Sequence, residues 1–187
     1  MPATLVLLVA ACSGSDESDP ELNANLREAT RAGRLAEARG LIEQGADVNA
    51  KDGTEQSAYL LATSEVGESP ALLDLMLGSG ADVQAKDSYN GTGLIRAAHR
   101  GYPELVRRLI EAGVELDHVN RLGWTALLEA IILGDGGHDH VETVRLIVEA
   151  GADVNIADNE GVTPLEHAEQ AGYDEIGAIL VAAGAAR

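Results

Sequence analysis

The sequence lacks several residue types on which other protein classes depend. Its 187 residues include no Phe, and only 3% are aromatic, so a large aromatic core cannot form. A single cysteine excludes an internal disulfide bond. Basic residues are few, because 13 Lys and Arg oppose 31 Asp and Glu, for a net charge of −18. Nucleic acids and anionic membrane surfaces attract cationic proteins, so this balance argues against direct binding to either.

The one cysteine, Cys12, follows a short apolar run. Residues 4–11 are apolar and end in small side chains, and a polar stretch rich in Gly, Ser and Asp begins at Ser13. The run is too short to span a bilayer, which needs about 20 apolar residues. Residues 9–12, Val-Ala-Ala-Cys, resemble the lipobox of bacterial lipoproteins, in which the cysteine is acylated and becomes the mature N-terminus.

This resemblance implies a cellular location for the protein. It divides the start of the chain into a signal peptide at 1–11, a lipidation site at Cys12 and a flexible tether over 12–20. The mature protein would then be anchored on the periplasmic side of a bacterial envelope, with no other membrane contact. Ser13 after the cysteine favours the outer membrane. The alternative is a frayed apolar N-terminus on a cytoplasmic protein.

Internal repetition dominates the rest of the chain. A segment of the form Gly-Ala-Asp-Val-Asn recurs with small changes, at glycine spacings of 35, 33, 38 and 33 residues. The repeated glycines are Gly45, Gly80, Gly113, Gly151 and Gly184. A period of this length is typical of a solenoid, in which each unit packs only on its neighbours. Glycine at this position suits the left-handed residue that ends a helix.

A second motif runs in phase with the glycines and predicts where helices begin. In its best copy, Thr163 suits an N-cap and Pro164 suits the first helical position. A small residue follows each copy and lets two helices approach closely: Ala29, Ala62, Ala97, Ala130 and Ala168. Each unit is therefore predicted as a helix, a tight turn, a second helix and an extended turn into the next unit.

The motif Thr163-Pro164-Leu165-Glu166 and its period resemble the ankyrin repeat. The resemblance covers residues 21–187 and implies an all-α solenoid of about five repeats with finger-like turns. The expected repeats are 21–50, 51–85, 86–118, 119–156 and 157–187. The histidine of the family motif is replaced in this sequence, so the hydrogen bond that it usually makes is expected to be absent. The replacing residues are Leu60, Ile95, Leu128 and Glu166.

Two units are longer than the basic period. The extra residues fall near 64–68 and 134–140, at the joint between the two helices of units two and four. The second insertion contains possible metal ligands. They are Asp135, His138, Asp139 and His140. Three glycines predict a flexible loop that is solvated or contacts a partner, and a metal site or metal-dependent activity is the alternative.

The residues before this insertion are also unusual. Residues 131–133 are Ile-Ile-Leu, where the preceding unit has the polar pair His99-Arg100. They predict either an extended first helix with a small additional core or an exposed apolar contact patch.

The expected binding face lies on the fingers and first helices of units three and four. Residues 86–118 carry as many basic as acidic side chains, which is unusual in so acidic a chain. The large and basic residue types enriched in binding hot spots gather here. The candidates are Tyr89, Arg96, His99, Arg100, Arg121 and Trp124. Two alternatives stay open: the basic residues pair within the chain, and Trp124, the only Trp, fills a gap between fingers.

The sequence favours a binding module over an enzyme. No nucleophile elbow or dinucleotide-binding loop occurs, and the neighbours Glu166 and His167 lack a third catalytic partner in the sequence. The ankyrin resemblance implies a monomeric scaffold without a cofactor that binds a partner protein along its concave groove. A scaffold, chaperone-like or immunity and inhibitor role would fit such a groove.

Overall fold

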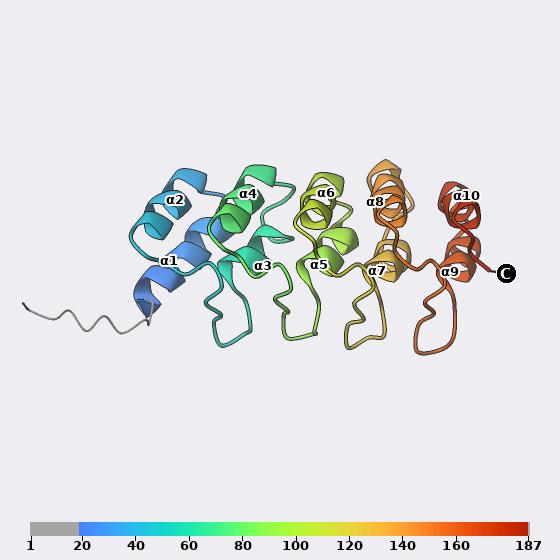
Figure 1. Ribbon diagram of the computed structural model, residues 1–187, viewed down its shortest axis with the longest axis horizontal. Helices are drawn as coiled ribbons and strands as arrows, with labels where there is room; N and C mark the ends of the chain where they lie inside the picture. Colours follow the sequence, from blue (N-terminus) through green and yellow to red (C-terminus); the bar gives the residue numbers. More distant parts are fainter. Residues whose placement is uncertain (1–18, 187) are drawn as a thin grey trace, which may run out of the picture.

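The computed structural model describes residues 19–186 and consists of ten helices in five pairs (Figure 1). The helices are α1 (Pro20–Arg31), α2 (Leu35–Glu43), α3 (Ala58–Ala62), α4 (Pro70–Gly78), α5 (Gly93–Arg100), α6 (Pro103–Glu111), α7 (Ala126–Ile132), α8 (His138–Glu149), α9 (Pro164–Ala171) and α10 (Asp174–Ala182). The predicted all-α solenoid of five helix pairs is confirmed. The signal peptide, Cys12 and most of the predicted tether lie outside the described residues.

The pairs stack side by side into one array with two rows of helices (Figure 1). The odd-numbered helices form the inner row, beside the extended turns, and the even-numbered helices form the outer row. The extended turns, here called fingers, project from the same side of the array. They comprise residues 51–57, 86–92, 119–125 and 157–163 in units two to five. Within residues 19–186, no helix has the length and apolarity needed to cross a membrane.

The helix starts follow the sequence signals. Thr92, Thr125 and Thr163 each precede an inner helix, and each side chain accepts the backbone N–H three residues further on. Glu166 completes a reciprocal capping box with Thr163. The family histidine is thus replaced in unit five by a carboxylate that still satisfies the helix terminus. The repeated glycines have positive φ angles, 81° at Gly113 for example, which confirms their predicted left-handed conformation.

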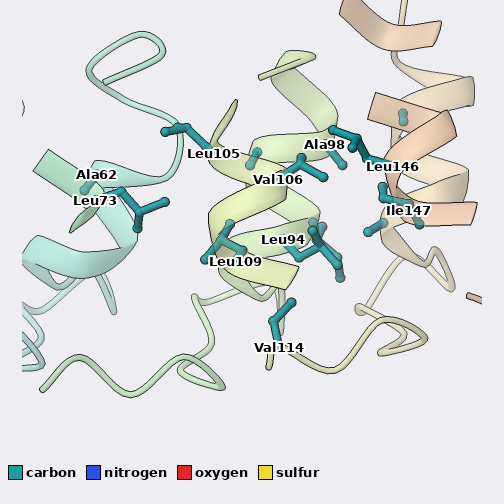
Figure 2. Close-up of a cluster of buried hydrophobic side chains, with 14 of the residues drawn as sticks. Ala62, Leu73, Leu94, Ala98, Leu105, Val106, Leu109, Val114, Leu146 and Ile147 are labelled. Carbon is teal, nitrogen blue, oxygen red and sulfur yellow. The ribbon is translucent and has the colours of Figure 1, made fainter. Parts of the chain in front are cut away.

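Small aliphatic side chains form one continuous core between the two rows (Figure 2). All five predicted alanines are fully buried, so neighbouring helices can lie close together. Leu94 and Leu109 connect the inner and outer helices of unit three, and Ile147 continues the core into unit four. Burial of such side chains stabilises each unit only when its neighbour is present, which makes the array cooperative.

Amide side chains link successive units along the turns after the outer helices. Asn49 donates to Gly80 O at 3.0 Å and accepts from Asp82 N at 2.7 Å. Gln84 repeats this pattern one unit later, toward Gly113 O and Glu115 N. These bonds fix the spacing of the units and therefore the spacing of the fingers.

Candidate functional site

Each finger is closed by an aspartate or asparagine near its start. Asp87 Oδ1 accepts the backbone N–H groups of Tyr89 and Gly91, each at 2.9 Å. Asn120 Oδ1 does the same for Leu122 and Trp124. These side-chain turns add to backbone hydrogen bonds within the same fingers, such as Asp87 N to Gly91 O and Asn120 N to Trp124 O, each at 3.0 Å. The residues that do this in units two to five are Asp52, Asp87, Asn120 and Asp158.

In units three, four and five, the closing residue contacts a polar side chain on the inner helix, nine positions further along the chain. Asp87 Oδ2 lies 2.8 Å from Arg96 Nη1, and Asp158 Oδ2 lies 2.8 Å from His167 Nε2. In unit two the ninth residue is the buried Leu61. There, Arg27 from α1 approaches Asp52 instead, at 3.9 Å. An acidic finger residue is thus matched with a basic helix residue.

Unit four reverses this chemistry. Asn120 replaces the finger aspartate, and its Nδ2 donates to Glu129 Oε1 at 2.7 Å. Glu129 is only 4% exposed, and its second oxygen, Oε2, is buried without a hydrogen bond among the described residues. The side chain that could offer it a positive charge is His99, whose Nδ1 lies 3.4 Å from Glu129 Oε2.

Burial sets the protonation of this pair. It raises the pKa of Glu129 to about 7, although the Asn120 hydrogen bond opposes the rise, and repulsion from Asp87 adds to it. Burial also lowers the pKa of His99, helped by repulsion from Arg100, His140 and Arg96. A neutral imidazole therefore faces a carboxyl group that changes charge near neutral pH.

Glu129 and His99 lie in a groove pocket of about 290 Å³ that units three and four line, together with Ser64 and Glu65 of unit two. Its rim carries three of the exposed large apolar side chains: Tyr89, Leu122 and Leu133, at 65%, 47% and 43% exposure. Apolar side chains around a few convergent polar groups are typical of a binding site.

Three hydrogen bonds join the fingers of units three and four, and a fourth contact comes from His118, just before the second finger. Arg121 N donates to Tyr89 O at 2.9 Å, and Arg121 Nη1 donates to Ser88 O. Asn90 Nδ2 donates to Val119 O at 3.1 Å, and His118 Nε2 lies 2.8 Å from Asn90 O. Tyr89 is therefore presented on a finger whose position is already fixed, which lowers the entropy cost of contact with a partner.

The structure brings four of the six predicted binding residues to this pocket: Tyr89, Arg96, His99 and Arg100. Their roles differ. Arg96 is only 12% exposed and pairs with Asp87 and, at 3.6 Å, with Glu65. Its Nε also donates to Leu60 O. Intramolecular pairing, one of the two predicted alternatives, is what the geometry of Arg96 shows.

The other two predicted residues lie elsewhere. Arg121 links two fingers, as described above. Trp124 is half-buried in the next gap, lined also by residues 158–160 of the following finger and by His167. This position matches the alternative in which Trp124 fills a gap between fingers.

The second insertion differs from the flexible loop that was expected. Residues 138–140 form the first turn of α8, and Asp135 Oδ1 accepts Gly137 N at 2.9 Å at its start. Tyr173 from unit five donates to Gly134 O at 2.9 Å and packs against Gly136. The glycines thus permit a close contact with the next unit.

The possible metal ligands do not converge. His140 Nδ1 lies 2.9 Å from Asp135 Oδ1, and His140 Nε2 lies 3.3 Å from His99 O, so both ring nitrogens have protein partners. His138 and Asp139 are exposed. Among residues 19–186, no three His, Cys, Asp or Glu side chains form a group that could hold a metal ion.

The prediction of an extended first helix in unit four is wrong. α7 ends at Ile132 and, with 7 residues, is shorter than α5 and α9, which have 8 each. Ile131 is buried, whereas Leu133 projects at the rim of the groove pocket. The apolar run thus contributes its last residue to an exposed contact surface, the second of the two predicted alternatives.

Sequence reasoning missed Glu129, Asn120, Leu122 and Leu133 as members of one site. A signal for the first two was present. Aligning the units at the finger start places Arg96, Glu129 and His167 at the same position, where Glu129 is the one acid. The exposure of the two leucines depends on packing across units, and the repeat pattern does not encode it.

Comparison with known proteins agrees with this architecture. The profile of ankyrin repeats, described as three copies, matches residues 58–158 and 94–186. The ankyrin repeat protein YahD of Escherichia coli is 36% identical over 148 residues, which cover 79% of this chain and 73% of YahD. The human ankyrin repeat and SOCS box protein 6 is 31% identical over 127 residues, which cover 66% of this chain and 30% of that protein.

A solved structure is also similar. The crystal structure of an ankyrin repeat domain from Acinetobacter baumannii superimposes with a TM-score of 0.83 at 48% sequence identity. The match covers 91% of this chain and 86% of that one. Proteins built from ankyrin repeats are generally non-enzymatic modules for protein–protein interaction. The stacked helix pairs, the capped inner helices, the closed fingers and these likenesses together assign this chain to the ankyrin repeat family.

Proposed function

We propose that this chain is a lipid-anchored protein of the bacterial envelope that binds a partner protein through its groove and fingers. The observation that supports the binding role is the groove pocket between units three and four. It combines exposed apolar side chains, among them Tyr89 and Leu133, with a finger pair held rigid by hydrogen bonds. Large apolar side chains on a preorganised surface contribute most of the affinity at typical interfaces.

The anchor proposal rests on the sequence around Cys12. The lipobox-like residues 9–12 and the polar stretch after them support acylation of Cys12, periplasmic exposure and, because Ser13 follows, sorting to the outer membrane. A cytoplasmic location is the alternative. The groove bears no catalytic constellation, so a scaffold, chaperone-like or inhibitory role fits it best, with the chain acting as a monomer.

Processing of the N-terminus tests the anchor. We expect the wild-type protein to incorporate labelled palmitate, partition into detergent and sediment with outer membranes. Cys12→Ser should abolish the labelling and release or mis-process the protein. Recovery of unprocessed, unlabelled wild-type protein from the cytosol would refute the anchor and leave the binding role intact.

Affinity capture tests the binding role. The wild-type chain serves as bait in native envelope extracts, with captured proteins identified by mass spectrometry. Tyr89→Ala should lose the specific partner. Val181→Ala removes a comparably exposed apolar side chain from α10, far from the groove pocket, and should retain it. Equal capture by both variants would show that this groove is not the binding surface.

A further inference from the structure

In unit four the helix residue is an acid, Glu129, and one of its two carboxylate oxygens has no donor among the described residues. In units three and five the helix residue, Arg96 or His167, lies 2.8 Å from an oxygen of the finger aspartate. In unit four, Asn120 occupies one oxygen of Glu129. Within residues 19–186 the other oxygen has no hydrogen-bond partner, although the side chain is almost fully buried and His99 Nδ1 lies 3.4 Å away. A buried acceptor without a partner is costly unless something else supplies a donor.

We propose that the groove pocket binds the side-chain ammonium group of a lysine, which the partner presents between apolar residues. The inference rests on the proposed binding function of this groove and names the chemistry that the groove recognises. The ammonium group would donate to Glu129 Oε2, and the flanking apolar residues would cover Tyr89, Leu122 and Leu133.

The charges around Glu129 favour a single added cation. The charged and titratable groups that line the pocket with it are Glu65, Asp87, Tyr89, Arg96, His99 and Arg100. Burial lowers the pKa of His99 and so favours its neutral form. Two carboxylates then balance two guanidinium groups, so ionised Glu129 gives the pocket one net negative charge. On the other side of α7, Asp158 Oδ2 is held by His167 Nε2 at 2.8 Å.

The geometry favours lysine over arginine. A guanidinium group binds a carboxylate best through two parallel hydrogen bonds, which need both oxygens. Asn120 already holds Oε1, so Glu129 offers one oxygen, which suits the point charge of an ammonium group. The four-carbon stem of lysine can also lie along apolar rim side chains while its charge reaches the pocket floor.

Binding should depend on pH because only ionised Glu129 attracts the cation. The pKa of this group is about 7 in the free protein, so binding of lysine should release a proton. If the cation binds only the ionised form, affinity at pH 6 should be about tenfold lower than at pH 8. Burial lowers the pKa of His99 from its ordinary value, which disfavours its charged form in this interval.

Short peptides test this inference without knowledge of the partner. The probe is acetyl-Gly-Leu-Lys-Leu-Gly-amide, titrated into the protein at pH 6 and pH 8 and followed by NMR shifts of the Tyr89 and His99 side chains. We expect binding at pH 8 that is about tenfold weaker at pH 6. The same peptide with norleucine in place of lysine should bind at least about tenfold more weakly at pH 8 and show no pH dependence.

Glu129→Gln is the decisive variant, since its amide oxygen can still accept from Asn120. It should reduce lysine-peptide binding at pH 8 to the norleucine level. Glu149→Gln removes the same charge from the exposed end of α8 and should leave binding unchanged. A thermal midpoint measured for each variant confirms that it is folded.

Several results would overturn the inference. They are equal binding of the lysine and norleucine peptides, tighter binding of an arginine peptide, and lysine binding by Glu129→Gln equal to wild type. If one of these results is found and a partner is still captured in a Tyr89-dependent way, the lysine assignment is wrong and the proposed binding function is retained. Absence of Tyr89-dependent capture, together with Glu129-dependent lysine binding, would instead count against the proposed function alone.

Discussion

Asn120 Nδ2 lies 2.7 Å from Glu129 Oε1, across the same nine-residue separation that joins Asp87 to Arg96. The two pairs close equivalent fingers with opposite polarity. In one the helix residue is a cation that matches an acid, and in the other it is a buried acid that a neutral amide satisfies only in part. The second arrangement stabilises the finger less, because the carboxylate loses its hydration and gains no counter-charge.

Replacing this acid should change how stability varies with pH. Burial raises the folded-state pKa of Glu129 to about 7 from its ordinary 4.5, so the folded state binds more protons than the unfolded state between these values. Wild-type stability should therefore fall as pH rises from 4.5 through 7, by about 3 kcal/mol in total from this group. Glu129→Gln should not show this loss.

Urea denaturation at pH 5 and pH 8 measures the effect. The difference between Glu129→Gln and wild type isolates the one group, because all other titrations are shared. We expect the variant to gain stability relative to wild type at pH 8. A difference that does not change with pH would mean that Glu129 ionises normally in the folded protein.

Arg96 should act mainly on stability. Its guanidinium group pairs with Asp87, which is itself 9% exposed, and donates to Leu60 O and Thr63 Oγ1 of the preceding unit. Arg96→Ala should lower the free energy of unfolding by about 2–3 kcal/mol, because it leaves a buried carboxylate unpaired. Chemical denaturation measures this. Arg96→Lys keeps the charge and should lose less; a loss below about 0.5 kcal/mol in the alanine variant would contradict the structural role.

Tyr89 and Trp124 should separate binding from folding. Tyr89 is 65% exposed on its finger, so Tyr89→Ala should leave the thermal midpoint unchanged and weaken partner binding by about 2 kcal/mol. Trp124 is half-buried against the next finger, so Trp124→Ala should lower stability by about 1–2 kcal/mol. Calorimetry and binding titrations on both variants decide this. If Trp124→Ala binds weakly and melts normally, Trp124 is a contact residue after all.

Two glycines with matching backbone angles report on contact between fingers. Gly113 and Gly123 have φ angles of 81° and 83°. A Cβ atom at Gly113 would meet nothing within 4 Å, whereas one at Gly123 would lie 2.4 Å from the Asn159 side chain. Both alanine variants should lose about 1–2 kcal/mol to backbone strain.

Gly123→Ala should lose about 1 kcal/mol more, since it displaces Asn159 from its hydrogen bond to Leu122 O. Denaturation of the two variants, each also in an Asn159→Ala background, separates the effects. The extra loss should vanish in that background. Equal losses in all four proteins would show that the finger contact is not stabilising.

Much of the fold could be predicted because its determinants are local. Threonine before each of the last three inner helices, and glycine after each outer helix, act within a few residues of their own position. Their effect is therefore visible in the repeat. The buried alanines follow from the same period.

The site was harder to predict because its properties depend on several units at once. Arg96 is of a residue type that is common in binding sites, but it forms ion pairs with Asp87 and Glu65. Only the folded structure shows these pairs. The free oxygen of Glu129 depends on Asn120 and on a histidine one unit away. At the start of α8, Asp135 Oδ1 lies 2.9 Å from His140 Nδ1, a contact across the insertion that composition alone does not reveal.

The contact between Tyr173 and the insertion has a consequence for how such an array can be lengthened. The hydroxyl group of Tyr173, in unit five, donates to Gly134 O, and its ring packs beside Gly136. Both glycines belong to unit four, the longest unit. If unit five were duplicated, the second copy would pack on the first, which has no such insertion. A copy placed before unit four would pack on unit three, whose joint between the two helices is shorter. We therefore expect units four and five to keep this contact only when they are transferred as a pair, and new copies to fit more easily between other neighbours.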